Sequence, residues 1–527
     1  MPTSLSLPVS SNQPNRPTPG GCACQNKSAL RSDQHPDQSK DQPKGQPKEK
    51  CGVIGIWNDP DAVRKVYLGL YAQQHRGQEA AGIAVTDGEI IEAHTGQGLV
   101  VDVFDRDVIT KLEKLQNHSD AGDANHGAIG HNRYSTAGGS KFCNAQPLVE
   151  TTFAGPVAIA HNGNLVNGDE WRKELSRVGR LFHTTSDTEV IIHLLASPEL
   201  RDTPDPVAAT LRNLLGAFSL VLLFPDRIEA ARDPWGWRPL VLGELPSGKP
   251  VVASETVAFD VIGAKYIREI EPGEIVTLSN KGVTSRRFAA QSEPLAQCVF
   301  EHVYFANPAS NVFGQNVQIS REQFGAKLAQ EAFVEADFVM PMPDSGRSAA
   351  NGYAIESGIP YREGIVPNRY VGRTFIKPTQ EERAAAVRLK LNVISEVVRD
   401  QRLIIVDDSI VRGTTTRLKM IQLREAGAKE IHLRISCPPI KHPCFFGVDF
   451  ADRDQLVAHG RSVEEIREFL GVDSLYYLSQ EGMLSVMNQD PKHYCTGCFS
   501  GEYRVDVDHP VACEVATKAQ LSMFKTI

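Results

Sequence analysis

The sequence predicts an α/β protein of two parts, an α+β sandwich of sheets and helices followed by an α/β domain with a parallel sheet. From residue 51 to about residue 290, short apolar segments alternate with glycine-rich turns, which is typical of sheets packed on each other or on helices. From about residue 300, apolar strands alternate with helical segments, which is typical of a parallel sheet. Near residue 405, a buried strand, two carboxylates and a Gly-Thr-Thr-Thr turn follow one another.

Each predicted element rests on an apolar run bounded by turn residues. In the first part, the strands cover 53–57, 82–85, 157–160, 220–224 and 239–242, and the helices cover 62–74 and 188–195. In the second part, the strands cover 337–340, 403–406 and 431–435, and the helices cover 348–356 and 416–426. Ser462 and Glu465 form a capping-box pattern, which predicts a further helix that ends near Leu470.

The composition narrows the class of protein. The chain has 527 residues, 41% hydrophobic and 23% charged, enough for two or three domains. Its net charge is -8 and it has no basic stripe, so nucleic acid is not an expected partner. No apolar run approaches the roughly 18 residues of a membrane span, so we expect no membrane contact. Ten cysteines without a secretory signal indicate a reducing cytoplasm, with thiols used for catalysis or metal binding.

Residues 1–50 form a separate block that is rich in Pro, Gln, Ser, Asn and Lys and poor in apolar residues. Such a segment cannot bury enough apolar surface to fold, so we expect it to be disordered. It lacks the apolar core of a secretory signal. We expect a propeptide that is removed, and we place the domains at 51–290 and 291–475, with a tail at 476–527.

The run 403–416 carries the most specific signal. Ligands of open α/β sheets bind at the carboxyl ends of the strands, where Asp407 and Asp408 stand. The turn that opens the next helix offers N–H groups and hydroxyls for a phosphate, and the carboxylates suit sugar hydroxyls and Mg²⁺. These groups predict a site for a ribose with a 5-phosphate and a metal-bound diphosphate; the alternative is a strand-turn-helix unit with two solvated aspartates. The run resembles the phosphoribosylpyrophosphate (PRPP) loop of type I phosphoribosyltransferases.

Cys51 stands at the junction between the leader and the first predicted strand. Once the leader is removed, its free α-amine, with a reference pKa of about 7.7–8.0, can act as the base for its own thiol. One alternative is a buried cysteine at the start of a strand, and another is an internal nucleophile that needs a histidine base. The position at the leader boundary favours the amine.

Four further motifs follow Cys51, at 74–82, 130–136, 160–165 and 185–189. Together they resemble the glutaminase domain of class II glutamine amidotransferases, which implies an N-terminal-nucleophile αββα sandwich. The resemblance implies that Arg133 binds the α-carboxylate of glutamine and that Asp187 binds its α-ammonium group. It also implies an oxyanion hole, made by the side-chain amide of Asn162 and the backbone N–H of Gly163.

These residues have simpler interpretations when each is taken alone. Arg133 and Asp187 would then suit an ion pair, and Asn162-Gly163 would suit a tight turn. Their order after Cys51 reverses that preference. The nearby His75, His131 and His161 are expected to be structural.

A glutaminase domain followed by a PRPP site resembles the glutamine phosphoribosylpyrophosphate amidotransferase family, over nearly all of residues 51 to about 505. The resemblance implies that ammonia from glutamine displaces pyrophosphate from PRPP and gives 5-phosphoribosylamine, the first committed step of purine synthesis. It places Asp407 and Asp408 at the ribose hydroxyls and at one Mg²⁺ per subunit, with Ser345 at the family's metal position. It places Arg373 and Lys377 in a mobile loop that closes over PRPP. The 5-phosphate would be held by Arg412, Gly413, Thr414, Thr415 and Thr416.

The resemblance also implies an iron–sulfur cluster. Cys298, Cys444, Cys495 and Cys498 match the ligand positions of the cluster-bearing members, and four thiolates suit a 4Fe-4S centre. A Cys-x-x-Cys pair alone could hold zinc or nothing. Neither half-reaction moves electrons, so we expect a structural cluster. The family further implies a homotetramer that purine nucleotides inhibit.

Two departures from the family pattern and two alternative functions stay open. Asn307 and Ala309 replace the arginine and aspartate of the family's usual Ala-Arg-Pro-Asp-Ser, and the leader is longer than usual.

The first alternative function is a non-enzymatic regulator that senses PRPP or purine nucleotides on a phosphoribosyltransferase fold. The second is a phosphoribosyltransferase that uses only free ammonia beside an inactive glutaminase.

Overall fold

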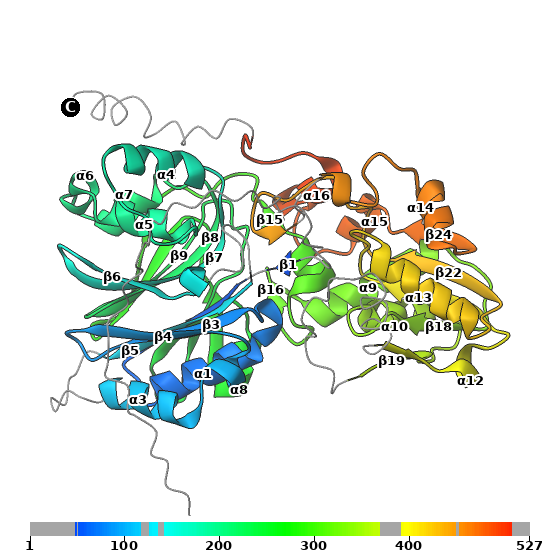
Figure 1. Cartoon of the computed structure of the whole chain (residues 1–527), viewed down its shortest axis with the longest axis horizontal. Helices are drawn as coiled ribbons and strands as arrows, with labels where there is room; N and C mark the ends of the chain where they lie inside the picture. Colours follow the sequence, from blue (N-terminus) through cyan, green and yellow to red (C-terminus); the bar gives the residue numbers. More distant parts are fainter. Residues whose placement is uncertain are drawn as a thin grey trace, which may run out of the picture. The chain divides into compact units, whose positions relative to one another are not determined.

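A computed structural model describes residues 48–49, 51–116, 126–134, 142–368, 391–449 and 453–507 (Figure 1). Contacts divide the chain into residues 1–44 and 45–527, and the fold described below belongs to the second unit. The predicted disorder of the leader therefore stays a prediction. Of that leader, the structure describes only β1 (Lys48–Glu49), which pairs with β23 (Val448–Asp449). Arg373 and Lys377 lie outside the described residues.

Two antiparallel sheets form the first half of this unit. The larger sheet has the order β12-β10-β11-β2-β5-β3-β4, and the other has the order β14-β13-β9-β8-β7-β6. The strands of the larger sheet are β2 (Gly52–Trp57), β3 (Ala80–Thr86), β4 (Ile91–Gln97), β5 (Gly127–Arg133), β10 (Val241–Glu244), β11 (Pro250–Ala253) and β12 (Lys265–Glu269). Those of the other sheet are β6 (Leu148–Thr152), β7 (Gly155–Leu165), β8 (Gly216–Phe224), β9 (Arg227–Arg232), β13 (Glu274–Ser279) and β14 (Gly282–Arg287).

The two sheets pack face to face, and helices cover the outer face of each (Figure 1). The sequence of β2 is apolar throughout because alternate residues point to opposite faces of the sheet and both faces are buried. Val53 and Trp57 pack against the second sheet, whereas Ile54 and Ile56 pack under the helices. The covering helices are α1 (Ala62–Ala72), α3 (Arg106–Gln116) and α8 (Val257–Ile262) on one side, and α4 (Gly168–Arg177), α5 (Thr188–Leu195) and α7 (Pro206–Leu211) on the other. This is the expected αββα sandwich.

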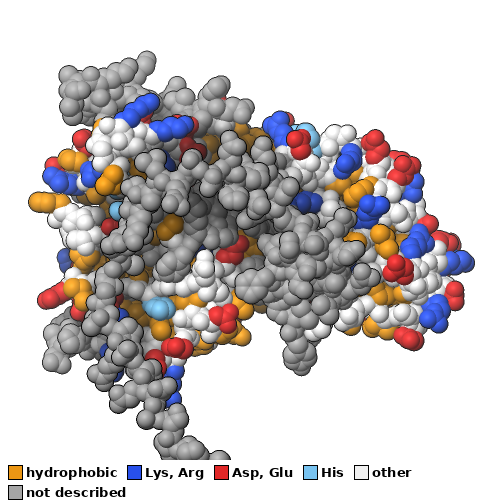
Figure 2. Space-filling model, in the orientation of Figure 1, with side chains coloured by type: hydrophobic (Ala, Val, Ile, Leu, Met, Phe, Trp, Pro, Cys, Tyr) orange, Lys and Arg blue, Asp and Glu red, His pale blue; other side chains and the backbone are white. Residues whose placement is uncertain are grey.

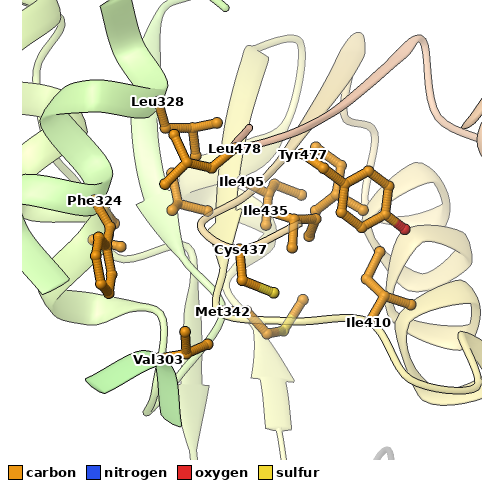
Figure 3. Packing of buried hydrophobic residues seen from close by; sticks show 14 of the residues in the cluster. Val303, Phe324, Leu328, Met342, Ile405, Ile410, Ile435, Cys437, Tyr477 and Leu478 are labelled. Carbon is orange, nitrogen blue, oxygen red and sulfur yellow. The ribbon is translucent and has the colours of Figure 1, made fainter. Parts of the chain in front are cut away.

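A parallel sheet with the order β18-β21-β22-β24 forms the second half. Figure 3 shows Phe324 and Leu328 beside the strands that carry Ile405 and Ile435, with Cys437 inside the same apolar core. The strands are β18 (Phe338–Pro341), β21 (Arg402–Asp407), β22 (Glu430–Ile435) and β24 (Ser474–Tyr477). The helices are α9 (Val317–Glu331), α10 (Arg347–Ser357), α13 (Thr414–Glu425), α14 (Val463–Leu470), α15 (Gln480–Ser485) and α16 (Gly497–Ser500).

Short elements complete the described chain. The helices and helical turns are α2 (Val100–Val103), α6 (Pro198–Arg201), α12 (Ser395–Val398), η1 (Gln74–Arg76), η2 (Phe142–Asn144), η3 (Glu301–Phe305), η4 (Arg453–Gln455) and η5 (Pro491–His493). The strands are β15 (Gln297–Cys298), β16 (Asn311–Val312), β17 (Gln315–Asn316), β19 (Ile365–Pro367), β20 (Leu391–Val393) and β25 (Tyr494–Cys495).

Most predicted elements are present, with two informative differences. The capping box of α14 is confirmed, because Ser462 Oγ accepts the N–H of Glu465 at 3.2 Å while Glu465 Oε2 accepts the N–H of Ser462 at 2.7 Å. The strand predicted over 239–242 is wrong in its bounds: β10 begins only at Val241, since Pro239 has no N–H to give to a ladder. Strand β24 was not predicted, and it runs through the boundary proposed at residue 475.

The described part of the predicted tail packs into the second core. Met483, Tyr494 and Phe499 all belong to the apolar cluster around the parallel sheet. No helix in the described ranges is both long and apolar enough to cross a bilayer. In Figure 2, acidic and basic side chains are interspersed on the visible face of this half.

Candidate functional site

Cys51 lies directly before β2, and its side chain is buried. Its Sγ is 3.8 Å from the carbonyl oxygen of Tyr134. Burial raises the pKa of the Cys51 thiol; the charge of Asp187 adds to this, and the guanidinium groups of Arg133 and Arg76 oppose it. The structure therefore brings the predicted glutamine-binding pair, Arg133 and Asp187, close to the thiol. A thiol with a raised pKa needs a base before it can attack.

Asp187 is held as a carboxylate before the first turn of α5. Its Oδ2 accepts the N–H of Leu165 at 2.8 Å, and its Oδ1 is 3.6 Å from Nδ1 of His161. Burial alone would raise the pKa of Asp187, but His161 and the N–H donors outweigh it and hold the pKa below its usual range. A buried ionised carboxylate of this kind suits an ammonium group.

Asn162 and Gly163 lie in β7, opposite Ser219 and Phe218 of β8. A Cβ on Gly163 would stand 2.0 Å from the carbonyl oxygen of Ala217, so only glycine fits there. Asn162 is 1% exposed, and its amide nitrogen has no hydrogen-bond partner among the described residues. A buried donor without a partner is costly, unless a ligand supplies an acceptor.

The three nearby histidines have partners other than the Cys51 thiol. His131 Nε2 is 3.1 Å from the carbonyl oxygen of His161, and His75 Nε2 is 2.9 Å from Glu255 Oε1. Burial lowers the pKa of His131 to about 3, so its ring is neutral at working pH. These placements agree with structural roles, and they leave the base for the thiol to be found elsewhere.

Arg76 is a site residue to which sequence reasoning gave no role. Its Nε donates to the carbonyl oxygen of Cys51 at 3.1 Å, and its Nη1 contacts Glu255 as well as Glu301, the latter at 3.2 Å. Arg238 Nη1 also contacts Glu301, at 3.4 Å. The four charged side chains are all buried, so Cys51 is connected to a charge network that reaches into the second half.

The segment that departs from the family pattern contacts this network. The backbone N–H of Asn307 and the hydroxyl of Ser310 both donate to Glu255 Oε2, at 2.9 Å and 2.7 Å. Asn307 Oδ1 accepts the N–H of Ala309 at 3.0 Å. A backbone group and a hydroxyl of this segment therefore connect it to Glu255 of the first half.

Asp407 and Asp408 stand at the carboxyl end of β21, as predicted. Both are buried, and the N–H of Asp408 donates to Asp407 Oδ1 at 2.9 Å. Burial raises the pKa of both carboxyls, and the charge of Asp408 raises that of Asp407 further. Ser345 and Ser409 donate hydrogen bonds to Asp408. A cation at this strand end would relieve the repulsion between the two carboxylates.

The residues predicted to bind the 5-phosphate surround the start of α13. Gly413 has φ +72°, a left-handed conformation that favours glycine, and it is the N-cap residue of the helix. Thr414 and Thr415 form the first turn, where backbone N–H groups lack helical acceptors. The structure thus brings Arg412, Gly413 and the three threonines to the same strand end as the aspartates.

The four predicted cluster cysteines come together where the two halves meet. Cys298 of β15 is the direct partner of Cys495 in β25, and Cys498 lies in α16. Burial raises the pKa values of Cys444, Cys495 and Cys498, and each of the three is raised further by neighbouring thiols. No three His, Cys, Asp or Glu side chains of the described residues are close enough to hold a single metal ion.

Comparisons with known proteins agree with this geometry. The glutamine amidotransferase domain family matches residues 131–261. The amidophosphoribosyltransferase of Bacillus subtilis is 46% identical over 464 residues, which cover 87% of this chain and 95% of that protein. The chain belongs to the amidophosphoribosyltransferase family. Another member, from Synechococcus elongatus, is 45% identical over 485 residues, covering 91% of this chain and 95% of that protein.

Solved structures of the family share the whole fold. A glutamine PRPP amidotransferase from B. subtilis, complexed with ADP and GMP, superposes with a TM-score of 0.79 at 43% identity. It covers 88% of this chain and 100% of that one. A structure described as the allosteric regulatory enzyme of purine biosynthesis gives a TM-score of 0.80 at 44% identity, covering 88% and 98%.

Proposed function

We propose that this chain makes 5-phosphoribosylamine, glutamate and pyrophosphate from PRPP, glutamine and water, as the family's activity implies. The observation that supports the proposal is the presence of two candidate sites in one chain. Arg133 and Asp187 converge on the thiol of Cys51, and Asp407 and Asp408 stand beside a phosphate loop. A regulator without activity would need neither a nucleophile nor an unpaired oxyanion donor.

In the first half-reaction, the sulfur of Cys51 attacks the side-chain amide carbon of glutamine. The proton of the Cys51 thiol passes to the α-amine that leader removal would free, and from there to the departing ammonia. The negative oxygen of the tetrahedral intermediate accepts hydrogen bonds from Asn162 and Gly163, and the C–N bond then breaks to leave a thioester. Water hydrolyses the thioester and releases glutamate. Arg133 and Asp187 hold the two charged groups of the amino acid.

In the second half-reaction, the nitrogen of ammonia bonds to the anomeric carbon of PRPP while the bond to pyrophosphate breaks. Asp407 and Asp408 would bind the ribose hydroxyls, and the five loop residues from Arg412 to Thr416 would bind the 5-phosphate. Magnesium, one ion per subunit, would neutralise charge on the leaving diphosphate, with Ser345 nearby. Closure by Arg373 and Lys377 over PRPP stays part of the proposal.

Cys298, Cys444, Cys495 and Cys498 would hold a 4Fe-4S cluster with a structural role. The supporting observation is that these four thiols converge between the halves, next to Arg238. Protein purified without oxygen should contain about four irons and four acid-labile sulfides per chain. Absence of both would reject the cluster and leave the rest of the proposal intact.

Further assignments follow from the family alone. Purine nucleotides are the proposed inhibitors, since the B. subtilis structure was solved with ADP and GMP. A homotetramer in the cytoplasm, with residues 1–50 removed and domains at 51–290 and 291–475, completes the proposal. The intact mass of the active protein tests the leader: a chain that still begins at Met1, yet uses glutamine, would reject the α-amine as base.

One variant separates the proposal from its two alternatives. Cys51→Ala should lose glutamine-dependent pyrophosphate release and keep release driven by ammonium chloride. If the wild-type protein works only with ammonia, the glutaminase is inactive. If it releases no pyrophosphate with either nitrogen source, the chain is a non-enzymatic sensor.

A further inference from the structure

The segment Phe445–Gly447 lies against the strand that carries the proposed oxyanion hole. Asn164, the residue after Gly163 in β7, donates its amide Nδ2–H to the carbonyl oxygen of Phe445 at 2.9 Å. These two residues are 281 positions apart in sequence. Both also line a cavity of about 190 Å³ that Asp187 borders. The second half of the chain thus reaches the edge of the glutamine site.

Gly447 makes a second contact with the same strand, through its backbone. A Cβ placed on Gly447 would stand 3.1 Å from the carbonyl carbon of Gly163, 3.3 Å from its Cα and 3.1 Å from Nη2 of Arg238. On its other side, Gly163 meets the backbone of Ala217, where a Cβ would stand 2.0 Å from the carbonyl oxygen. The oxyanion residue is therefore enclosed between two backbones, one of them from the far half.

The segment is itself held firmly. Arg238 Nη2 donates to the carbonyl oxygen of Phe446 at 2.5 Å, and the Phe446 ring stacks on Trp237 with centroids 4.4 Å apart at an angle of 16°. From the C-terminal side, the hydroxyl of Tyr503 donates to the carbonyl oxygen of Pro443 at 2.7 Å. A well-held segment can fix the position of the strand that it touches.

We propose that Phe445–Gly447 is a positioning element for the oxyanion hole, acting through Asn164 and Gly163. The inference rests on the proposed glutaminase function and adds to it. Oxyanion donors are effective only when they are aimed in advance at the position of the developing charge. A small displacement of these donors lowers the catalysed rate strongly, because a shift of about 1 Å can reduce the rate by on the order of 100-fold. The Asn164 hydrogen bond and the Gly447 contact would keep the two oxyanion donors in that position.

The first test removes the hydrogen bond from the strand side. We expect Asn164→Ala to lower the kcat of glutamine hydrolysis about tenfold, less than the roughly 10²–10³ that loss of a whole oxyanion donor costs. The KM for glutamine and the ammonia-dependent rate should stay within about twofold, because neither depends on the oxyanion. Asn164→Leu, which keeps a side chain of similar shape but cannot donate, should behave in the same way.

The second test acts from the other half, with a matched control. Gly447→Ala places a methyl group against Gly163, whereas Gly282→Ala imposes nearly the same backbone strain in open space, since the φ values are +100° and +98°. We expect only Gly447→Ala to lower glutamine-dependent kcat with little change in the ammonia-dependent rate. If Gly447→Ala does not fold, the Asn164 variants decide the question alone.

Two outcomes would overturn the inference. One is a glutamine-dependent kcat within about twofold of wild type in both the Asn164 and Gly447 variants. The other is an equal fall in the glutamine- and ammonia-dependent rates, which would make the contact merely structural. Cys51→Ala, assayed alongside, separates a failure of the positioning inference from a failure of the proposed function. If Cys51→Ala still hydrolyses glutamine, the proposed function fails, whatever the Asn164 variants do.

Discussion

At the scale of one residue, Asn162 combines an energetic cost with a proposed role in the oxyanion hole. Its buried amide nitrogen has no partner among the described residues, a state that costs about 1–3 kcal/mol. We predict that Asn162→Ala lowers glutamine-dependent kcat by about 10²–10³ and leaves the ammonia-dependent rate unchanged. The variant should melt no lower than wild type, because a costly group has been removed. Steady-state kinetics and a melting curve check both parts, and an unchanged kcat would reject the oxyanion role.

His131 makes a second residue-scale prediction, for the pH dependence of stability. Burial lowers its pKa to about 3 in the folded chain, whereas an exposed histidine titrates near 6.5. Between these values the unfolded chain binds a proton that the folded chain does not, so the free energy of unfolding falls as the pH drops from about 6.5 towards 3. The variant His131→Gln keeps an N–H donor for the carbonyl oxygen of His161, but its side chain does not titrate.

Melting temperatures measured from pH 8 to pH 4 should therefore fall less steeply for His131→Gln than for wild type. The difference at pH 8, where both side chains are neutral, reports packing alone and serves as the internal control. Parallel curves over the whole range would contradict the prediction.

At the scale of elements, the sequence predicted those parts that local chemistry determines. The strand β21, the acidic pair and the turn into α13 follow one another in a single run of residues, and the structure places them as expected. The capping box of α14 is likewise local. Strand β24 was missed because Ser474–Tyr477 has only four residues, and it becomes a strand by pairing with β22. Tertiary pairing decides such segments.

The end of β21 gives an element-scale prediction. Burial and the neighbouring Asp408 raise the pKa of Asp407, so the folded chain binds this proton more tightly than the unfolded chain does. Its contribution to the free energy of unfolding therefore falls as the pH rises above about 3.8, the ordinary value. We predict that Asp407→Asn melts higher than wild type at pH 8 without ligands, and that the difference shrinks towards pH 4.

The same variant should lose function. PRPP with Mg²⁺ should raise the melting temperature of wild type, because ligands that bind the folded state stabilise it. It should raise that of Asp407→Asn much less, and the ammonia-dependent rate should fall with it. A variant that is less stable at pH 8 yet still responds fully to PRPP would show that the carboxylate neither strains the strand end nor binds the substrate.

At the scale of the whole molecule, the contacts that join the halves could not be predicted from the sequence. Arg76 lies inside a recognised motif, but its partners Glu255 and Glu301 are 179 and 225 positions away. Asn164 and Phe445 are 281 positions apart. No periodicity or spacing relates such residues, and only the packed fold brings them together. The residues of the two candidate sites could therefore be predicted as two separate sets. The contacts that connect these sets could not be predicted.

That connection gives the last prediction, because Glu301 lies between Arg76 and Arg238 with no exposed surface. Removing one partner of a buried charge pair costs about 3–5 kcal/mol, since the remaining charge stays buried without compensation. We predict that Glu301→Ala lowers the melting temperature strongly. Because Arg76 donates to the carbonyl oxygen of Cys51, glutamine-dependent activity should fall more than ammonia-dependent activity.

Glu464→Ala is the matched control, because it removes the same side chain from a surface pair with Arg467 on α14. An exposed pair contributes about 0–1 kcal/mol, so this variant should melt close to wild type. The measurement is thermal unfolding followed both by the fluorescence of the four tryptophans, all of which lie between residues 57 and 237, and by loss of PRPP binding. Equal melting of the two variants would show that the buried network does not hold the halves together.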